Sequence, residues 1–437
     1  MVALPATCND DRCGFAFRAF ARQLMQTHFS NSRNADDTVT VAREINSLMG
    51  RVTRPPGFGF PAPYLVVSAG ENYGGNLFVW DHYHMSLRFA AAGRPEFLRY
   101  LCDNVFHHQE PDGFTPNCIL HGRGPRGSSS RFHAQPFLAR AAAGYLKATG
   151  DQAWATEVLP KITAYLDYYD RAHGSPLGLH RWAWPFHSGI DNDVVTTFHL
   201  PDSVVPADLS SFLVLEHRAL AYLADAIGAS GVDAERADAL SELIRQHLWS
   251  EDKSSFAAFD LLSGKHLFAI GGWKPGQANG AYAYQSCSNL IPLYAGVATA
   301  DQAAAMIPRY VLSADHFWSD FGIRSLSRSS EFYNNAIWGN PPRYGDHTRP
   351  TNSNWQGPIW FPLSFFVHRA LRKYGFPEEA DDLRARTLRV LALSVESVGS
   401  FAENFCGETG KPLYARDFAA WNLLADVMHD DLPWEFF

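Results

Sequence analysis

The sequence predicts an all-α fold, a toroid built from about six pairs of helices. Apolar residues recur at helical spacing along much of the chain. A repeated punctuation accompanies them, in which one helix ends at a glycine and the next begins within a few residues. Long irregular segments then separate one helix pair from the next.

Two helices show the periodicity clearly. From Asp208 the apolar residues follow a three-four spacing and stop at Gly228: Leu209, Phe212, Leu213, Leu220, Leu223 and Ile227. A second pattern runs from Asp151 to Tyr169. Pro160 lies inside it, and we expect this proline to bend or restart the helix because it lacks the backbone N–H.

The punctuation recurs five times. A glycine accepts the left-handed conformation that ends a helix, whereas proline or aspartate suits a helix start. The pairs are Gly93 with Pro95, Gly150 with Asp151, Gly228 with Asp233, Gly296 with Asp301, and Gly375 with Pro377. The glycines are on average about 70 residues apart. At this period the chain holds about six helix pairs, although counting does not establish that the ring closes.

The irregular segments are expected to carry the functional residues, because long loops in a compact domain are usually functional. They cover residues 51–79, 110–133, 171–206, 250–286 and 312–358. No interdomain linker separates them, so we predict one catalytic domain over residues 1–437. Segment 123–130 has the composition of a mobile loop, which fits a lid or an unimportant surface excursion equally well.

Composition excludes several classes of function. The formal net charge is −8 and the basic residues are scattered, which argues against a nucleic-acid partner. No apolar stretch reaches membrane-spanning length, and no basic segment followed by an apolar one opens the chain. The six cysteines lack metal-binding spacing and fit reduced thiols in a cytoplasmic protein. Self-association is left open.

Aromatic residues make up 14% of the chain, and several lie beside glycine, proline, aspartate or asparagine in the irregular segments. Examples are Trp80-Asp81, residues 182–185 and residues 355–360. Most aromatic residues must pack in the core. Aromatic rings among hydrogen-bonding side chains also suit sugars, whose faces are apolar and whose edges carry hydroxyls. A small carbohydrate is therefore the expected partner.

Two acidic segments lie far apart in the chain, one around Asp191 and one around Glu403. Two carboxyl groups brought together by folding, one a proton donor and one an activator of water, can cleave a glycosidic bond. Taken alone, each segment is equally good turn chemistry, because Asp193 follows Asp191 closely and Glu408 lies in a Gly-Glu-Thr-Gly sequence. Whether Asp193 or Glu408 assists is open.

Several segments together resemble a known family. They are Phe78-Val79-Trp80-Asp81, residues 109–117, Ser188-Gly189-Ile190-Asp191-Asn192, residues 355–360, and Glu403-Asn404-Phe405. In this order they resemble the trehalase-like clan of inverting glycosidases, in particular glycoside hydrolase family 63 and its compact glucosylglycerate and mannosylglycerate hydrolases. The resemblance covers most of residues 70–425. It implies an (α/α)6 barrel.

The resemblance also implies roles for individual residues. Asp191 matches the general acid and Glu403 the general base. The implied sugar contacts are Phe78, Trp80, Asp81, Asn117, Gln135, Gly189, Trp355 and Trp360, with the three tryptophans as walls of the pocket. Four positions depart from the family pattern: Asn117, His187, Asp193 and Gln356. These departures leave the identity of the substrate open.

The expected function is an inverting, exo-acting α-glycosidase that hydrolyses a small α-glucoside, either a disaccharide or a glucosylated small acid. One alternative is a sugar epimerase or isomerase on a helical toroid, which would use histidines such as His187 as acid and base. The other is a non-catalytic sugar-binding protein.

We predict no metal and no cofactor. His82 and His84 lie two residues apart in a predicted helix and therefore point to different faces. No phosphate-binding loop, nucleophile elbow or dinucleotide fingerprint occurs.

Overall fold

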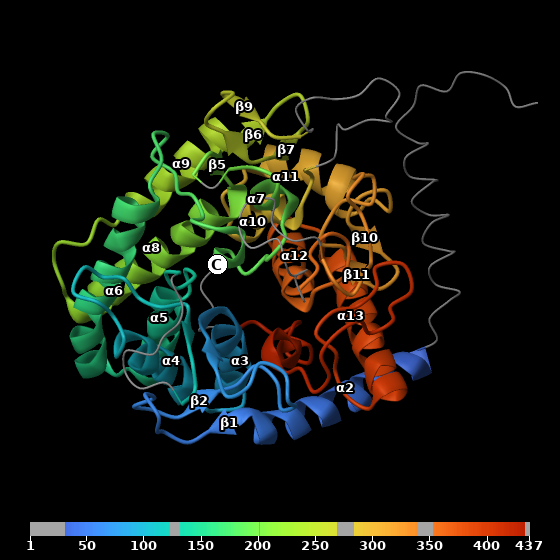
Figure 1. Ribbon diagram of the computed structural model, residues 1–437, viewed down its shortest axis with the longest axis horizontal. Helices are drawn as coiled ribbons and strands as arrows, with labels where there is room; N and C mark the ends of the chain where they lie inside the picture. Colours follow the sequence, from blue (N-terminus) through green and yellow to red (C-terminus); the bar gives the residue numbers. More distant parts are fainter. Residues whose placement is uncertain (1–30, 123–131, 201, 269–283, 340–352, 433–437) are drawn as a thin grey trace, which may run out of the picture.

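The computed structural model describes residues 31–122, 132–200, 202–268, 284–339 and 353–432. Figure 1 shows the helices arranged around a central region, from α2 (Asn31–Val52) round to α13 (Pro377–Val398). Short strands and irregular segments connect them. The predicted all-α toroid is confirmed.

Within the described residues, six elements form an inner ring: α3 (Val79–Ala91), α5 (Leu138–Thr149), α8 (Ala207–Ile227), α10 (Ile291–Tyr294), α12 (Phe361–Lys373) and η5 (Ala420–Leu424). Each packs against the next in this order, and η5 packs against α3. The ring therefore closes, a property that the spacing of helices in the sequence did not establish.

An outer layer surrounds the ring and consists of α4 (Glu96–Phe106), α6 (Gln152–His173), α9 (Arg236–Leu248), α11 (Ala300–Met306) with η4 (Ile307–Val311), α13 and α2. The sequence explains the two layers. In the inner helix α5 every residue from Leu138 to Leu146 is buried. The outer helix α9 buries residues only at a three-four spacing, which leaves one face for solvent.

The glycine punctuation is confirmed. Positive φ angles occur at all five helix-ending glycines, with values between 66° and 84°: Gly93, Gly150, Gly228, Gly296 and Gly375. Two details refine the prediction. Helix α6 continues through Pro160, which faces solvent, so water can satisfy the carbonyl that the proline leaves unpaired. Helix α9 begins at Arg236, because Asp233 instead accepts a hydrogen bond from the Glu235 N–H in a turn before it.

Aromatic rings fill the centre of the inner ring. Trp80 on α3 packs edge-on against Phe137, Phe212 and Phe366, with ring centroids 5.2, 5.8 and 6.2 Å away. These partners precede or belong to α5, α8 and α12. The centre of the barrel is therefore a packed core. Trp80 lies at the end of this core where the irregular segments converge.

A buried ion pair lies in the same core. Arg140 and Glu216 have fully buried side chains, and Arg140 Nε is 3.2 Å from Glu216 Oε1. The Glu216 carboxylate also accepts hydrogen bonds from the backbone N–H groups of Ala139 and Arg140. It thus satisfies donors at the start of α5 that the helix itself leaves unpaired.

Short antiparallel pairs of strands stabilise the irregular segments. They pair β1 (Thr53–Arg54) with β2 (Tyr64–Leu65), β3 (Leu77–Phe78) with β4 (Cys118–Ile119), β6 (Trp249–Ser250) with β7 (Ser255–Phe256), and β10 (Trp318–Ser319) with β11 (Gly322–Ile323). A three-stranded sheet joins β5 (Val204–Val205), β8 (Phe259–Asp260) and β9 (Lys265–His266). The remaining short helices are η1 (Pro185–His187), α7 (Val194–Thr197) and η3 (Cys287–Leu290).

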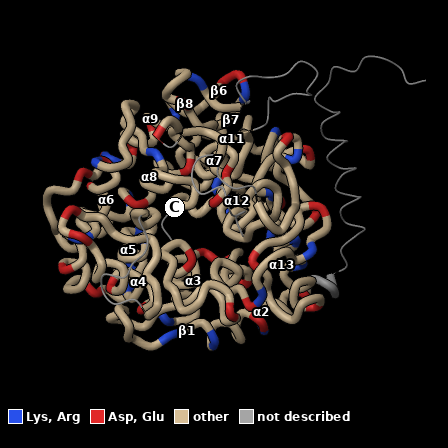
Figure 2. The backbone as a smooth tube through the Cα atoms, in the orientation of Figure 1, with Lys and Arg blue, Asp and Glu red and all other residues tan. Residues whose placement is uncertain are grey.

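One large cluster of buried apolar residues extends from Val41 to Leu432. The organisation of residues 1–437 as a single domain remains a prediction. Basic and acidic residues are interspersed around the periphery (Figure 2). None of the described helices is long and apolar enough to cross a membrane.

Candidate active site

A cavity of about 360 Å³ opens where the irregular segments meet above Trp80. Its size falls in the usual range of small-molecule sites. Eight of the ten residues predicted for the site line it: Phe78, Trp80, Asp81, Asn117, Gln135, Gly189, Asp191 and Glu403. The structure therefore brings Asp191 and Glu403 to one hollow.

The start of α3 positions the first group. Strand β3 pairs with β4, so that Phe78 lies opposite Cys118. The Val79 N–H donates to the Asn117 carbonyl at 3.0 Å, which fixes Asn117 beside the helix start. Trp80 and Asp81 follow in the first turn of α3 and line the cavity.

A tight turn carries Asp191. Gly189 has a φ of 82°, and a Cβ atom there would lie 3.0 Å from Trp80 Cε3. Only glycine meets both conditions without strain. The Ile190 N–H donates to Ser188 Oγ at 2.9 Å, and Asn192 Oδ1 accepts from the Trp355 N–H at 2.6 Å. The hydrogen bonds of the residues on either side of Asp191 therefore fix the backbone that carries its side chain.

Asp191 is equipped to hold a proton near neutral pH. Burial raises the pKa of its carboxyl to about 7, against a smaller lowering by a hydrogen bond from Ser353. Burial likewise raises the pKa of Asp81 to about 8, and the neighbouring charge of Asp191 adds to the effect. At neutral pH the cavity therefore carries fewer charges than carboxyl groups.

Glu403 also lines the cavity and lies on an irregular segment. Its backbone N–H donates to the Tyr414 and Ala415 carbonyls, and its residue is only 3% exposed. Tyr73 donates a 2.6 Å hydrogen bond to Glu403 Oε1. Burial raises the pKa of Glu403 well above its usual value, whereas the Tyr73 hydrogen bond lowers it. Tyr73 is thus the contact that favours the carboxylate needed in a base.

Four polar atoms of cavity-lining residues have no hydrogen-bond partner within the described residues. They are Trp80 Nε1, Gln135 Oε1, Glu403 Oε2 and Trp421 Nε1. The other end of the Gln135 amide is fixed, because Nε2 donates to the His187 carbonyl at 3.2 Å. Two donors and two acceptors are therefore free for a polar ligand such as a sugar or water.

Trp355 and Trp360 correct the prediction. Neither lines the cavity, and each is 1% exposed. Their rings stack on one another at 4.1 Å with an interplanar angle of 6°, and Trp360 packs against Trp421. Trp421 lines the cavity instead. Both indole N–H groups are bonded within the protein, Trp360 Nε1 to the Asn354 carbonyl and Trp355 Nε1 to Ser353 Oγ, so neither is free for a ligand.

Asp193 and Glu408 do not line the cavity either. Asp193 caps α7 through the Val195 N–H and accepts from Ser286 Oγ. Glu408 pairs with Arg324 at 3.1 Å. Both carboxylates thus have structural partners outside the cavity.

His187 is fully buried with both ring nitrogens engaged. Nδ1 accepts from the Ala183 N–H, and Nε2 lies 2.8 Å from the His133 carbonyl, to which it can only donate. The two partners fix a neutral tautomer, and burial lowers the pKa of the ring well below its usual value. His187 is therefore a structural residue.

Several residues of the wall are not predicted by any motif in the sequence: Val67, Tyr73, Cys118, Leu120, Phe132, Phe186, Ser353, Phe418 and Trp421. Most are single aromatic or apolar residues in irregular segments, where no periodic pattern marks them. All but Phe418 and Trp421 lie inside the predicted irregular segments, which is the one signal in the sequence that points to them. The predicted lid, residues 123–130, lies outside the described residues.

Comparisons with known proteins show the family of this chain. A family model described as the mannosylglycerate hydrolase MGH1-like glycoside hydrolase domain matches residues 75–420. A mannosylglycerate hydrolase from Rubrobacter radiotolerans is 27% identical over 223 residues, which are 50% of this chain and 42% of that protein. The chain thus matches less than half the length of that relative. A probable trehalase from Oryza sativa subsp. japonica is 21% identical, over 80% of this chain and 69% of that protein.

Solved structures share the fold. The GH63 mannosylglycerate hydrolase from Thermus thermophilus in complex with glucose gives a TM-score of 0.67 at 18% identity, covering 88% of this chain and 99% of that chain. The neutral trehalase Nth1 from Saccharomyces cerevisiae gives 0.61 at 17% identity, covering 85% and 73%. These neighbours confirm the expected (α/α)6 barrel. With its family model extending over most of the helical ring, the chain belongs to the mannosylglycerate hydrolase MGH1-like family of glycoside hydrolases, in the trehalase-like clan.

Proposed function

We propose that this chain is an inverting, exo-acting α-glycosidase that hydrolyses a small α-glucoside, with Asp191 as general acid and Glu403 as general base. The observation that carries the proposal is that both carboxyl groups line one cavity with Trp80 and Asp81. They come from segments far apart in the chain, as a two-carboxyl site requires.

The chemistry follows from the two environments. Asp191, with its pKa near 7, donates its proton to the glycosidic oxygen as the bond from that oxygen to the anomeric carbon breaks. Glu403 takes a proton from a water molecule whose oxygen bonds to the opposite face of the same carbon. For this geometry we expect the two carboxyl groups to be about 6.5–9.5 Å apart. The products are a sugar of inverted configuration and the free aglycone.

The cavity wall supports binding of a single sugar residue. Trp80, Phe418 and Trp421 offer aromatic faces, and Asp81 and Gln135 offer polar groups for hydroxyls. A hollow of about 360 Å³ fits a terminal sugar better than the interior of a long chain, which supports exo action.

The charge of the wall bears on the aglycone. Three carboxyl groups line the cavity, and the described lining residues include no lysine, arginine or histidine. A glycerate-like carboxylate would meet this acidic surface without a counter-charge. We therefore place a neutral disaccharide ahead of a glucosylated acid as the substrate.

A substrate panel tests the proposal. Purified protein is incubated with α-linked glucose disaccharides, α-glucosylglycerate and α-mannosylglycerate, and glucose or mannose release is measured. We expect fastest hydrolysis of a neutral α-glucoside, and a loss of at least about 100-fold in kcat for Asp191→Asn and for Glu403→Gln. Normal turnover by both variants would refute the catalytic assignment, and faster hydrolysis of the glycerates would refute the neutral aglycone.

The alternatives have less support. An epimerase needs a titrating histidine in the cavity, and His187 is buried with both nitrogens bonded. A sugar-binding protein would bind the sugars of the panel without turnover.

A cytoplasmic location is also part of the proposal. Cys102, Cys118, Cys287 and Cys406 are free thiols in the described structure, which fits a reducing compartment. Cell fractionation tests this point.

A further inference from the structure

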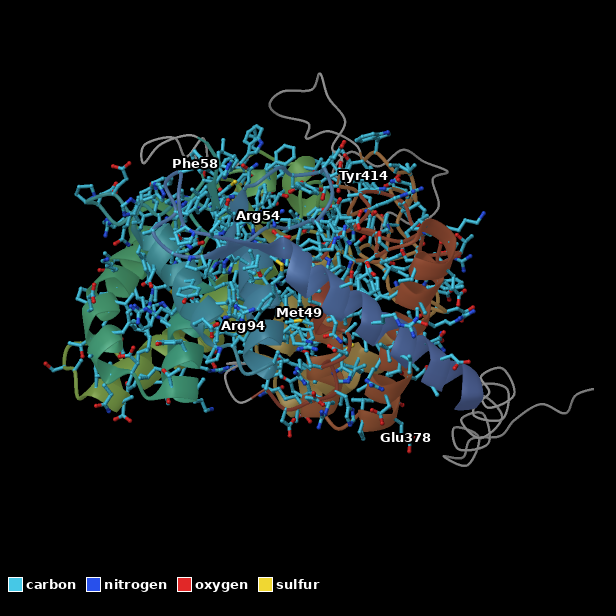
Figure 3. All side chains as sticks on the ribbon, turned by 90° about the horizontal axis from the view of Figure 1, so that it is seen from below. Met49, Arg54, Phe58, Arg94, Glu378 and Tyr414 are labelled. Atoms are coloured by element: carbon cyan, nitrogen blue, oxygen red, sulfur yellow. The ribbon has the colours of Figure 1, made fainter. Side chains whose placement is uncertain are left out.

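A second cluster of chemically active side chains lies far from the cavity. It consists of His368 in the second half of α12, Asp381 near the start of α13, and His429 after η5. Figure 3 shows Glu378, one turn before Asp381, at the edge of the molecule opposite Tyr414. The Tyr414 carbonyl is bonded to the Glu403 backbone, so the cluster is at the other end of the barrel from the cavity.

His368 is the unusual member of the cluster. Its residue is fully buried, yet neither ring nitrogen has a hydrogen-bond partner within the described residues. Buried polar atoms are nearly always paired, because an unpaired one costs about 1–3 kcal/mol. The imidazole therefore has a ring nitrogen free for a ligand.

The three side chains converge on one point. One ligand atom from each lies within 4.8 Å of the others. His429 Nδ1 and Asp381 Oδ1 are 3.4 Å apart. Ligands held at about 2.0–2.1 Å from a tetrahedral zinc ion are themselves about 3.4 Å apart. The spacing of this pair thus already matches two ligands of one ion.

We propose that His368, Asp381 and His429 form a site for a divalent transition-metal ion, with zinc as the best fit. Two imidazole nitrogens and one carboxylate oxygen are a donor set that zinc prefers, and three protein ligands leave a fourth position for water. The exposed fractions of the Asp381 and His429 side chains, 64% and 55%, leave the site open to an ion from solvent.

Nearby arginines set the affinity. Arg369 donates to the Met428 carbonyl at 3.2 Å, and Arg372 donates to the His429 carbonyl at 2.6 Å. These bonds hold the segment that carries His429 against α12. The positive charges of Arg369 and Arg372 repel a bound cation, while the negative charges of Asp381 and Asp431 offset part of that repulsion. We therefore expect moderate affinity.

The site would act as a structural clamp. A bound ion would link the segment after η5 to both α12 and α13. This segment follows Trp421, which lines the catalytic cavity. The ion would therefore stabilise the closure of the inner ring and would not touch the substrate.

The test uses full-length protein without a tag, stripped of metal by a chelator. Zinc chloride is titrated into it by isothermal titration calorimetry, and cobalt(II) is added separately to record the visible absorption of a tetrahedral site. We expect one equivalent of saturable binding and a rise in Tm with zinc. His429→Ala and Asp381→Asn should each weaken binding at least tenfold. Both positions are exposed, so folding should be retained.

Asp430→Asn is the matched control, since Asp430 is an exposed carboxylate beside His429 outside the cluster. It should bind zinc like the unmodified protein. The proposal would be overturned if the unmodified protein showed no saturable binding. It would also be overturned if His429→Ala and Asp381→Asn bound zinc as tightly as Asp430→Asn.

Discussion

The Tyr73 hydroxyl donates a 2.6 Å hydrogen bond to Glu403 Oε1, joining residues 330 positions apart. Tyr73 has a φ of 67°, an uncommon conformation for a residue other than glycine, and its ring packs against Phe78 and Phe418. The aromatic contacts fix the ring, and the ring fixes the carboxyl group. One residue thus both orients the proposed base and favours its ionised form.

Tyr73→Phe should therefore weaken catalysis while keeping an aromatic ring in the cavity wall. Loss of a hydrogen bond to a charged group costs about 1.5–3 kcal/mol, which corresponds to a fall in kcat of about 10- to 100-fold. The Tyr73 bond lowers the pKa of Glu403, so its removal should raise that pKa. The acid limb of the kcat/KM profile should move to higher pH. An unchanged acid limb would contradict the role of Tyr73.

The alkaline limb reports Asp191. A general acid works in its protonated form, so the rate should fall as pH rises through about 7. The Ser353 hydrogen bond lowers the pKa of Asp191, so Ser353→Ala should move this limb to higher pH. A pH–rate profile of both proteins checks the shift. Movement of the limb to lower pH would be inconsistent with Asp191 as the acid.

Gly189→Ala should affect activity through Trp80. The new Cβ would strain a backbone with a φ of 82° and would lie 3.0 Å from the indole. Gly231→Ala is a matched control, because its φ is 90° and no atom lies within 4 Å of the added Cβ. Each variant should lose about 1–2 kcal/mol of unfolding free energy. Only Gly189→Ala should lose kcat/KM, by tenfold or more; an equal loss in both would refute the contact.

Trp421 and Trp355 should separate binding from stability. Trp421 lines the cavity, so Trp421→Ala should raise KM. Trp355 is buried and stacks on Trp360, so Trp355→Phe should lower the free energy of unfolding by about 1–3 kcal/mol with little change in KM. Steady-state kinetics and urea unfolding of both variants test the distinction. A larger rise in KM for Trp355→Phe than for Trp421→Ala would show that the Trp355 ring lines the cavity.

The buried pair in the barrel core should dominate stability. Glu216→Gln leaves the Arg140 charge uncompensated in the interior and should cost about 3–5 kcal/mol. The exposed pair of Glu242 and Arg245 provides the comparison, where Glu242→Gln should change stability by less than about 1 kcal/mol. Equal losses of unfolding free energy for Glu216→Gln and Glu242→Gln, measured by chemical denaturation, would show that the buried pair contributes no more to stability than the exposed pair.

Much of the fold was readable from the sequence because its signals are local. The apolar spacing after Asp208 predicts α8, and Gly228 predicts its end. The sequence left open whether Pro160 bends or restarts helix α6. The helix does not restart there, because a proline on the solvent side of an outer helix removes a hydrogen bond that water can replace.

The site was predictable only where a motif marks it. The segments around Asp191 and Glu403 converge on one cavity, as their family resemblance implies. The same motifs gave no orientation for Trp355, whose ring turns away from the cavity to stack on Trp360. Tyr73 carries no pattern at all, because its importance comes from a contact across the whole chain.

The stereochemistry of the first product tests the central claim most directly. Proton NMR should follow the anomeric signals during hydrolysis of the α-glucoside that the panel shows to be cleaved fastest. Proton donation by Asp191 with water activated by Glu403 on the opposite face predicts that β-glucose forms first and then mutarotates. Appearance of α-glucose as the first product would contradict the account.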